Sequence, residues 1–197
     1  MNQLRSQKIA MKPAPFRLRS VVLGLQLSAF SFFLAACSLP TPQADLVRYF
    51  TLSTPATGAA APESVAVRPV RLAGHLRNRD MAVRISDNEV VYLEDVRWAE
   101  PLDEAITQLL RQRLRQIHSD AVVTVQVQRC ELVRDAGNAV QVTATYSISD
   151  AKGEGHTGAF TASPRMWDGK DHATLVSLLR EGVNELAEAI AQAVEKK

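Results

Sequence analysis

The chain has 197 residues, with 23 Lys and Arg against 21 Asp and Glu and a formal net charge of +2. Its first 36 residues carry five of the bases and no acid, so the remaining 161 residues hold 18 bases against 21 acids, a net charge of −3. The positive charge of the whole chain therefore gives no support to nucleic-acid binding.

The N-terminus has the pattern of an export signal. An apolar run from Val21 to Leu34 follows the basic start, an order typical of secretory signal peptides. The alternative is a transmembrane helix, which needs about 20 consecutive apolar residues. The run is shorter than that and contains Gln26, Ser28 and Ser31, so we expect a signal peptide.

The end of this signal resembles the bacterial lipobox. Residues 34–37 read Leu-Ala-Ala-Cys, and in the lipobox small residues fit the lipoprotein signal peptidase and the cysteine is acylated before cleavage. We therefore expect a lipoprotein signal peptide over residues 1–36 and lipid attachment at Cys37. Ser38 follows the cysteine, and by the usual bacterial sorting pattern the absence of aspartate there implies the outer membrane.

Residues 38–47, after the lipid-bearing cysteine, are polar and interrupted by proline. We expect residues 37–47 to form an acylated cysteine and a flexible tether, with a reach of about 30 Å. A single domain then occupies residues 48–197. Cys130 has no intrachain partner left and is expected to be buried as a small apolar residue; the alternative is a reactive thiol beside Arg129 and Arg134.

The first half of the domain contains four predicted strand segments and a helix. Residues 48–52 are rich in strand formers, and residues 65–72 predict an edge strand or bulge because Pro69 cannot donate to a sheet. Residues 81–86 and 89–93 predict a hairpin with a two-residue turn. Apolar residues at helical spacing predict an amphipathic helix over 101–118, with Trp98 packing over the core just before it.

The second half predicts three more strands and a long helix. Residues 121–133 alternate and then change phase, which predicts a bulge at 128–129, and residues 139–149 alternate throughout. A short strand follows at 159–162. The last helix begins near Asp171 as N-cap, and Gly182 within its apolar stripe indicates close packing. We predict an α+β fold in which a mostly antiparallel sheet carries both amphipathic helices on one face.

The sequence gives little support to a catalytic site or a metal site. Residues 153–158 match the dinucleotide fingerprint G-x-G-x-x-G, but they precede a strand and not a helix. The four histidines are scattered, no metal site or cofactor is indicated, and no G-x-S-x-G elbow is present. Residues 168–172 are rich in ionisable groups, and a turn followed by a helix N-cap accounts for them.

Charge is distributed unevenly along the domain. Five arginines form what we call the possible basic contact surface: Arg68, Arg71, Arg77, Arg79 and Arg84. The final helix carries the acids Glu181, Glu185, Glu188 and Glu195. This pattern fits an ordinary solvated surface, anionic lipid head groups, or a complementary subunit of the same protein.

Taken together, these segments resemble the PqiC family of auxiliary lipoproteins of ABC-type transport systems. The resemblance rests on the lipobox, on Tyr49 and Leu52 within a Tyr-Tyr-x-Leu-like strand, and on a segment that opens the first helix. That segment is Arg97, Trp98, Ala99, Glu100, Pro101 and Leu102. Phe50 departs from the expected tyrosine, and residues 74–76 depart from an expected Tyr-Leu pair.

The resemblance implies a lipid-anchored outer-membrane protein facing the periplasm, with no catalytic role. Its implied partner is an MCE-domain protein that forms a lipid passage across the periplasm, and the domain would dock the outer-membrane end of that passage as a homo-oligomeric ring. Two other classes remain open. One is an assembly lipoprotein of an outer-membrane complex, and the other is a periplasmic enzyme acting through Asp168 or His172.

Overall fold

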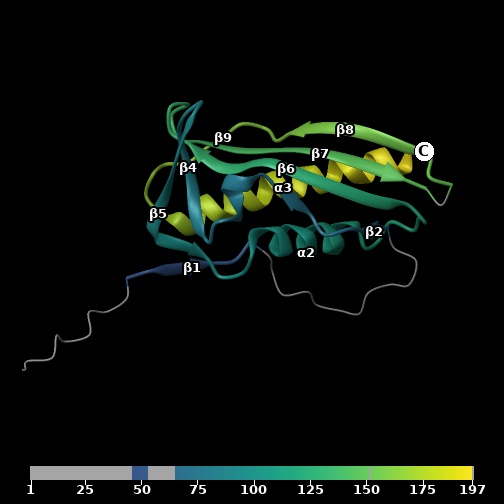
Figure 1. Ribbon diagram of the computed structural model, residues 1–197, viewed down its shortest axis with the longest axis horizontal. Helices are drawn as coiled ribbons and strands as arrows, with labels where there is room; N and C mark the ends of the chain where they lie inside the picture. Colours follow the sequence, from purple (N-terminus) through teal and green to yellow (C-terminus); the bar gives the residue numbers. More distant parts are fainter. Residues whose placement is uncertain (1–45, 53–64, 151, 197) are drawn as a thin grey trace, which may run out of the picture. The chain divides into compact units, whose positions relative to one another are not determined.

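The structure is a computed structural model that describes residues 46–52, 65–150 and 152–196. The predicted signal peptide, Cys37 and all but the last two tether residues lie outside this part of the chain. Within it, two α-helices lie against a large, mostly antiparallel sheet, as Figure 1 shows. The predicted α+β fold is confirmed.

The centre of the sheet is the pair β6 (Val122–Val133) and β7 (Ala139–Ser149), which run antiparallel. Beyond β7 lies β8 (Gly155–Thr161). On the other side, β4 (Asp80–Ser86) and β5 (Glu89–Trp98) form the predicted hairpin. The strand order is β1-β5-β4-β6-β7-β8.

Four short strands complete the sheet. β2 (Ala66–Val67) and β3 (Arg71–Leu72) pair with β6 in parallel, on either side of Pro69, as the proline predicted. β1 (Arg48–Phe50) pairs in parallel with the end of β5. β9 (Arg165–Met166) pairs with β7 and was not predicted, because two residues give no periodic signal.

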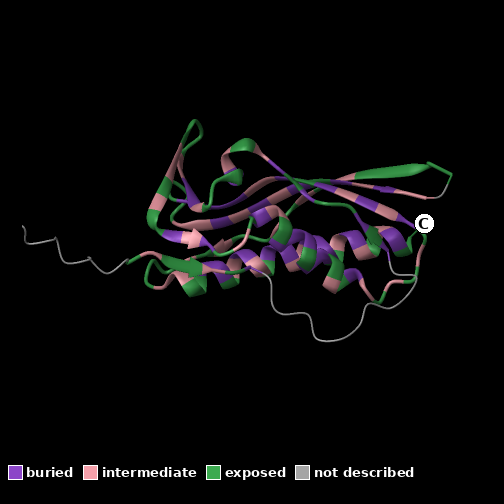
Figure 2. Ribbon diagram, turned by 60° about the horizontal axis from the view of Figure 1, so that its bottom comes forward, coloured by how far each residue is buried: buried purple, intermediate pink, exposed green. Residues whose placement is uncertain are grey.

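The helices bury their apolar stripes against the sheet. α2 (Leu102–Leu114) and the longer α3 (His172–Glu195) pack together, and the buried sides of helices and strands face one another in Figure 2. α3 begins at the predicted N-cap, where the Asp171 side chain accepts from the Thr174 amide. At Gly182 an added Cβ would lie 2.7 Å from Cγ2 of Val142, so the predicted close approach is confirmed.

The predicted bulge in β6 is also present. The register with β7 shifts between Val127 and Arg129, and after the shift Cys130 and Leu132 face the core while Glu131 points to the other face and is also fully buried. Burial raises the pKa of the Cys130 thiol to about 12, so the thiol is protonated at neutral pH and the buried, unreactive role expected for it is supported.

Several predicted boundaries were wrong. The strand predicted at 89–93 continues as β5 to Trp98. α2 ends at Leu114 and not at His118, because the carbonyl of Ile117 turns away to accept the amide of Val65 at 3.1 Å. The strand predicted at 159–162 begins earlier, at Gly155, so the glycine-rich motif lies partly in the turn before β8, where Gly153 has a φ of 81°, and partly in β8 itself. Gly158 is small enough to lie over the Tyr146 ring, where an added Cβ would meet Cζ at 2.4 Å. Among the described helices, none is long and apolar enough to cross a membrane.

Candidate functional site

The two sequence motifs of the resemblance meet in space at one end of β5. Tyr49 in β1 and Arg97 in β5 are direct partners in the sheet register, and Asp80 in β4 is the partner of Arg97 on its other side. The Arg97 guanidinium donates to Asp80 at 2.6 Å and also bonds to Tyr49. These hydrogen bonds, first Asp80 and then Tyr49, raise the pKa of Arg97. The Arg97 guanidinium therefore connects β1, β4 and β5.

The residues that follow in each motif continue this junction. The amide of Ala99 donates to the carbonyl oxygen of Phe50 at 2.8 Å, and the hydroxyl of Thr51 donates to the Glu100 carboxylate. The guanidinium of Arg180 in α3 donates to the carbonyl of Leu52 at 2.8 Å. β1 is thus joined both to the sheet and to the last helix.

The remaining motif residues are buried in the core or lie at the start of α2. Trp98, Leu52 and Leu102 are buried, which fits the predicted packing of Trp98 over the core. Pro101 is the N-cap residue of α2, and its carbonyl accepts the Ala105 amide at 3.0 Å. The structure therefore gives the motif a structural explanation: it joins β1, β5 and α2.

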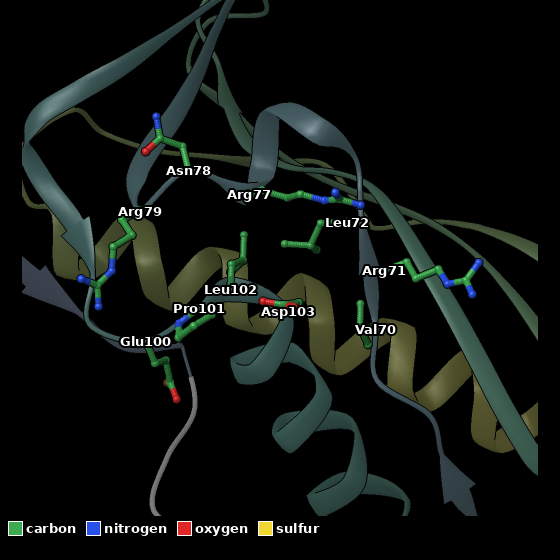
Figure 3. A pocket seen from close by; sticks show the side chains of 10 residues that line it. All are labelled: Val70, Arg71, Leu72, Arg77, Asn78, Arg79, Glu100, Pro101, Leu102 and Asp103. Carbon is green, nitrogen blue, oxygen red and sulfur yellow. The ribbon is translucent and has the colours of Figure 1, made fainter.

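A pocket of about 630 Å³ opens beside this junction. It lies between the start of α2, β3 and the 3-10 helix η1 (Gly74–Arg77), and Figure 3 shows its lining. In that view Leu72 and Leu102 face one another at the centre, with Arg77 on one side, Arg79 on another and Asp103 between Leu102 and Val70. The lining residues are Val70, Arg71, Leu72, Arg77, Asn78, Arg79, Glu100, Pro101, Leu102 and Asp103.

This pocket brings together residues from both predicted sets. Arg71, Arg77 and Arg79 come from the possible basic contact surface, and Glu100, Pro101 and Leu102 come from the motif. All three arginines are exposed; in Figure 3 the Arg77 side chain lies beside Leu72, whereas the guanidinium groups of Arg71 and Arg79 are directed away from the pocket centre on opposite sides. Arg68 is also exposed but does not line the pocket.

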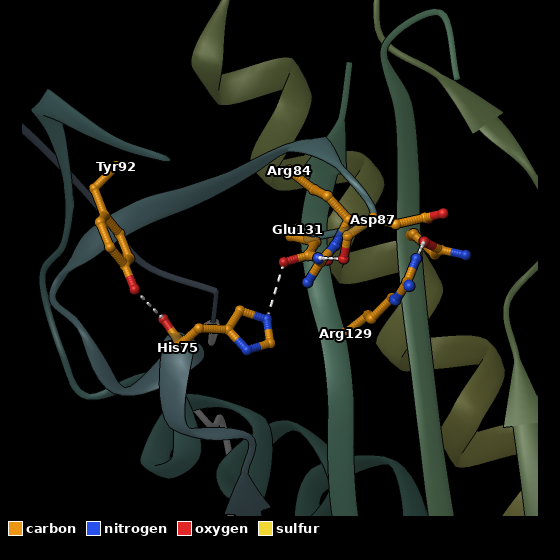
Figure 4. A network of polar contacts seen from close by, with 7 residues as sticks. His75, Arg84, Asp87, Tyr92, Arg129 and Glu131 are labelled. Carbon is orange, nitrogen blue, oxygen red and sulfur yellow. Dashed lines mark hydrogen bonds and ion pairs between the residues drawn. The ribbon is translucent and has the colours of Figure 1, made fainter. Parts of the chain in front are cut away.

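Arg84 does not belong to the exposed surface that the sequence predicted. Its side chain is 11% exposed, and its guanidinium donates to the fully buried carboxylate of Glu131 at 2.5 Å. His75 of η1 contacts the other oxygen of Glu131 at 3.0 Å, and Tyr92 donates to the His75 carbonyl at 3.1 Å (Figure 4). Arg84 therefore compensates an internal charge. Sequence analysis missed this network, because Glu131 looks like any polar residue of an alternating strand.

The acids of the last helix are also partly neutralised. Arg165, the first residue of β9, donates to Glu181 at 3.0 Å and pairs with Glu185. These hydrogen bonds, first from Arg165 and then from the Ser163 amide, lower the pKa of Glu185. The predicted contrast between a basic region and an acidic helix is smaller than the sequence indicated.

Residues 168–172, the segment considered for an enzymatic role, make the contacts of a turn followed by a helix N-cap. Hydrogen bonds from the amides of Ala173 and Thr174 lower the pKa of Asp171, as expected of an N-cap. Asp168 accepts from the Lys170 amide at 3.1 Å, and the His172 ring lies 5.4 Å from that of Trp167. In the part of the chain that the structure describes, no three His, Cys, Asp or Glu side chains gather into a metal-binding group.

Comparison with known families identifies the chain. The family model described as "ABC-type transport auxiliary lipoprotein component" matches residues 50–191. The chain belongs to this family. A lipoprotein family of this kind indicates a membrane-anchored protein of the periplasm that works with other transport components, and the predicted resemblance is confirmed.

Solved structures support the fold of this auxiliary lipoprotein. An uncharacterised protein is 19% identical with a TM-score of 0.59, covering 74% of this chain and 97% of its own. A Xanthomonas campestris protein is 16% identical with a TM-score of 0.58, covering 75% of this chain and 91% of its own. A search of curated proteins finds no match.

Proposed function

We propose that the mature protein is a non-enzymatic lipoprotein of the outer membrane that docks the outer-membrane end of an MCE-type lipid passage. The observation that carries this proposal is the match to the auxiliary lipoprotein family over residues 50–191. The junction at Arg97 adds to it, because the motif residues on which the resemblance rests lie side by side and position an exposed, basic surface.

The anchor in this proposal is Cys37. Several acyl chains, at about 0.8 kcal/mol for each buried CH₂, hold a protein on a membrane durably where a single chain does not. Residues 38–47 would then allow the domain to stand up to about 30 Å from the bilayer. The domain itself spans residues 48–197 and needs no catalytic group for this role.

The docking surface in this proposal includes Arg68, Arg71, Arg77 and Arg79. These exposed cations lie on or beside β2, β3 and η1, so an acidic surface on the MCE partner would be attracted to them. The passage is a closed structure around an axis, and a homo-oligomeric ring of this protein would match that geometry.

A pull-down from membranes tests the partner. The tagged lipoprotein and the candidate MCE protein are expressed together, solubilised in mild detergent and captured through the tag. We expect the MCE protein in the eluate. Failure to recover it, with its expression demonstrated in the same membranes, would contradict the proposal. Crosslinking to an outer-membrane barrel instead would favour an assembly factor, and hydrolytic turnover lost in Asp168→Asn or His172→Gln would favour an enzyme.

A further inference from the structure

The pocket beside α2 has the size and lining of a small-ligand site. Its volume, about 630 Å³, lies within the range of roughly 300–1,000 Å³ that is usual for such sites. Val70, Leu72, Pro101 and Leu102 provide an apolar surface, and charged side chains stand around it. A ligand that fills this pocket should therefore be amphiphilic.

The arginines around the pocket differ from most others in the domain. Within residues 46–52, 65–150 and 152–196, the guanidinium groups of Arg71, Arg77 and Arg79 have neither an ion pair nor a hydrogen bond in the protein. Guanidinium groups with protein acceptors are the more common case: Arg84, Arg97, Arg111, Arg113, Arg129, Arg165 and Arg180. Unpaired guanidinium groups around a pocket are suited to a phosphate, which they bind in bidentate geometry.

A carboxylate inside the pocket restricts the charge that a ligand can carry. Asp103 is half-buried, and its carboxylate has no partner within the described residues. Its place in the first turn of α2 stabilises the helix dipole, but it would repel a ligand that carries only negative charge. A head group with both a phosphate and an ammonium group satisfies the arginines and Asp103 together.

The pocket is also connected through one hydrogen bond to the residue that follows β1, the first strand after the predicted tether. Glu100 lines the pocket and bonds to Thr51, directly after β1, and ten residues separate Cys37 from β1. Ten extended residues reach about 30 Å. With Cys37 acylated, the start of β1 is therefore within this distance of lipid head groups.

We propose that this pocket binds the head group of a phospholipid whose phosphate is esterified to an amino alcohol. The phosphate contacts Arg77 and also Arg79, whose exposed side chain turns toward the pocket when the ligand binds. The ammonium group contacts Asp103, and the glycerol end lies on Leu72 and Leu102. This inference rests on the proposed function only for the anchor that brings the pocket to a membrane.

Calorimetric titration of the full mature lipoprotein in neutral detergent tests the site without any protein partner. The probes are dihexanoyl phosphatidylethanolamine, dihexanoyl phosphatidylglycerol, glycerophosphoethanolamine and inorganic phosphate. We expect saturable binding of the ethanolamine lipid, weakened at least about tenfold by the double variant Arg77→Ala, Arg79→Ala. The matched control removes two exposed cations away from the pocket, Arg134→Ala with Lys152→Ala, and should leave binding unchanged.

A second variant separates the two charges of the ligand. Asp103→Asn should weaken the ethanolamine lipid and strengthen phosphatidylglycerol, so that the preference for the ethanolamine lipid is lost. Inorganic phosphate binding as tightly as the lipid would reveal a free-anion site and overturn the proposal. Equal affinity of the wild-type protein and the Arg77, Arg79 variant would do the same.

Partner capture distinguishes this inference from the proposed function. If no lipid probe binds but Arg77→Ala with Arg79→Ala abolishes recovery of the MCE protein, the pocket is a protein-docking surface and the lipid assignment is wrong. If the lipid binds as expected while no MCE protein is recovered, the pocket assignment stands and the partner assignment fails.

Discussion

At the scale of single residues, the buried carboxylate of Glu131 is the group whose partners should matter most for the stability of the domain. It is fully buried and contacts Arg84 at 2.5 Å and His75 at 3.0 Å. Removing one member of a buried charge pair leaves the other uncompensated, at a cost of about 3–5 kcal/mol. We expect Glu131→Gln to lower the free energy of unfolding, measured in urea, by an amount near the lower end of that range, because the amide still accepts a hydrogen bond.

Glu188→Gln is the matched control, because Glu188 is exposed on α3 and its neutralisation should change stability by less than about 0.5 kcal/mol. Replacing the whole group with apolar side chains (His75→Leu, Arg84→Met and Glu131→Leu) should recover most of the loss. Unchanged stability of Glu131→Gln would mean that the network contributes nothing to folding.

Gly182 gives a second prediction at this scale, in which two effects compete. Alanine gains about 1 kcal/mol of helix propensity over glycine, but its Cβ would lie 2.7 Å from Cγ2 of Val142. Overpacking of this kind costs about 1–3 kcal/mol. We expect Gly182→Ala to destabilise the protein in urea unfolding.

In a Val142→Ala background the contact with Cγ2 is removed and the Cβ of residue 142, at 3.1 Å, becomes the nearest atom, so the same substitution should cost less stability than in the wild-type protein. Gly74→Ala is the control, because nothing lies within 4 Å of its added Cβ. If Gly182→Ala is stabilising in the wild-type background, α3 does not approach β7 as closely as described.

At the scale of elements, β1 depends on a side chain for its place in the sheet. Its three residues pair only with the end of β5, and Arg97 joins it through Tyr49 to Asp80. We expect Arg97→Ala to speed amide hydrogen exchange in residues 48–52 and to leave β6 and β7 unaffected, as measured by mass spectrometry. Arg97→Lys keeps the charge but not the fork of donors, so its effect should be intermediate.

Arg113→Ala is the control for exchange, because the side chain of Arg113 donates to Asn184 on the exposed side of the helix pair, away from β1. Equal exchange rates for residues 48–52 in Arg97→Ala and the wild-type protein would show that Arg97 is not needed to hold β1, and that its backbone pairing and the contacts of Glu100 and Arg180 are enough.

The connection between Arg165 and α3 predicts a pH dependence. Hydrogen bonding to Arg165 lowers the pKa of Glu185 from its ordinary value of 4.5. The stabilisation is therefore fully present above pH 4.5 and is lost as the pH falls through the lower pKa of the folded state. We expect Glu185→Gln to be less stable than the wild-type protein at pH 7, with the difference shrinking as the pH is lowered below 4.5. A difference that is constant with pH would contradict this.

Local patterns predicted the elements whose signals lie within a few residues. The interruption at Pro69, the bulge after Val127 and the N-cap at Asp171 are examples, because each follows from backbone chemistry at one position. Pairings between distant segments could not be predicted in this way. Nothing near Tyr49 indicates that Arg97 is its partner, and the burial of Glu131 depends on η1, a helix that the periodicity does not reveal.

At the scale of the whole molecule, the role proposed for the domain is to hold a basic surface and a pocket close to a membrane. The junction at Arg97 holds β1 against β5, and Glu100, which bonds to Thr51 directly after β1, also lines the pocket where the exposed arginines gather. The anchor, the basic surface and the pocket would then all act close to the membrane. Cys37→Ala tests this arrangement: the domain should fold but remain soluble in the periplasm and fail to restore function. Full complementation by that variant would show that the anchor is dispensable.

The most direct test of the central claim is crosslinking in intact cells followed by separation of the two membranes. A photoreactive amino acid replaces Arg68, on the exposed basic surface, and the crosslinked products are identified by mass spectrometry. The account predicts a product with an MCE-domain protein that sediments with the outer membrane. Products only with outer-membrane barrels, or recovery of the lipoprotein only in the inner membrane, would contradict it.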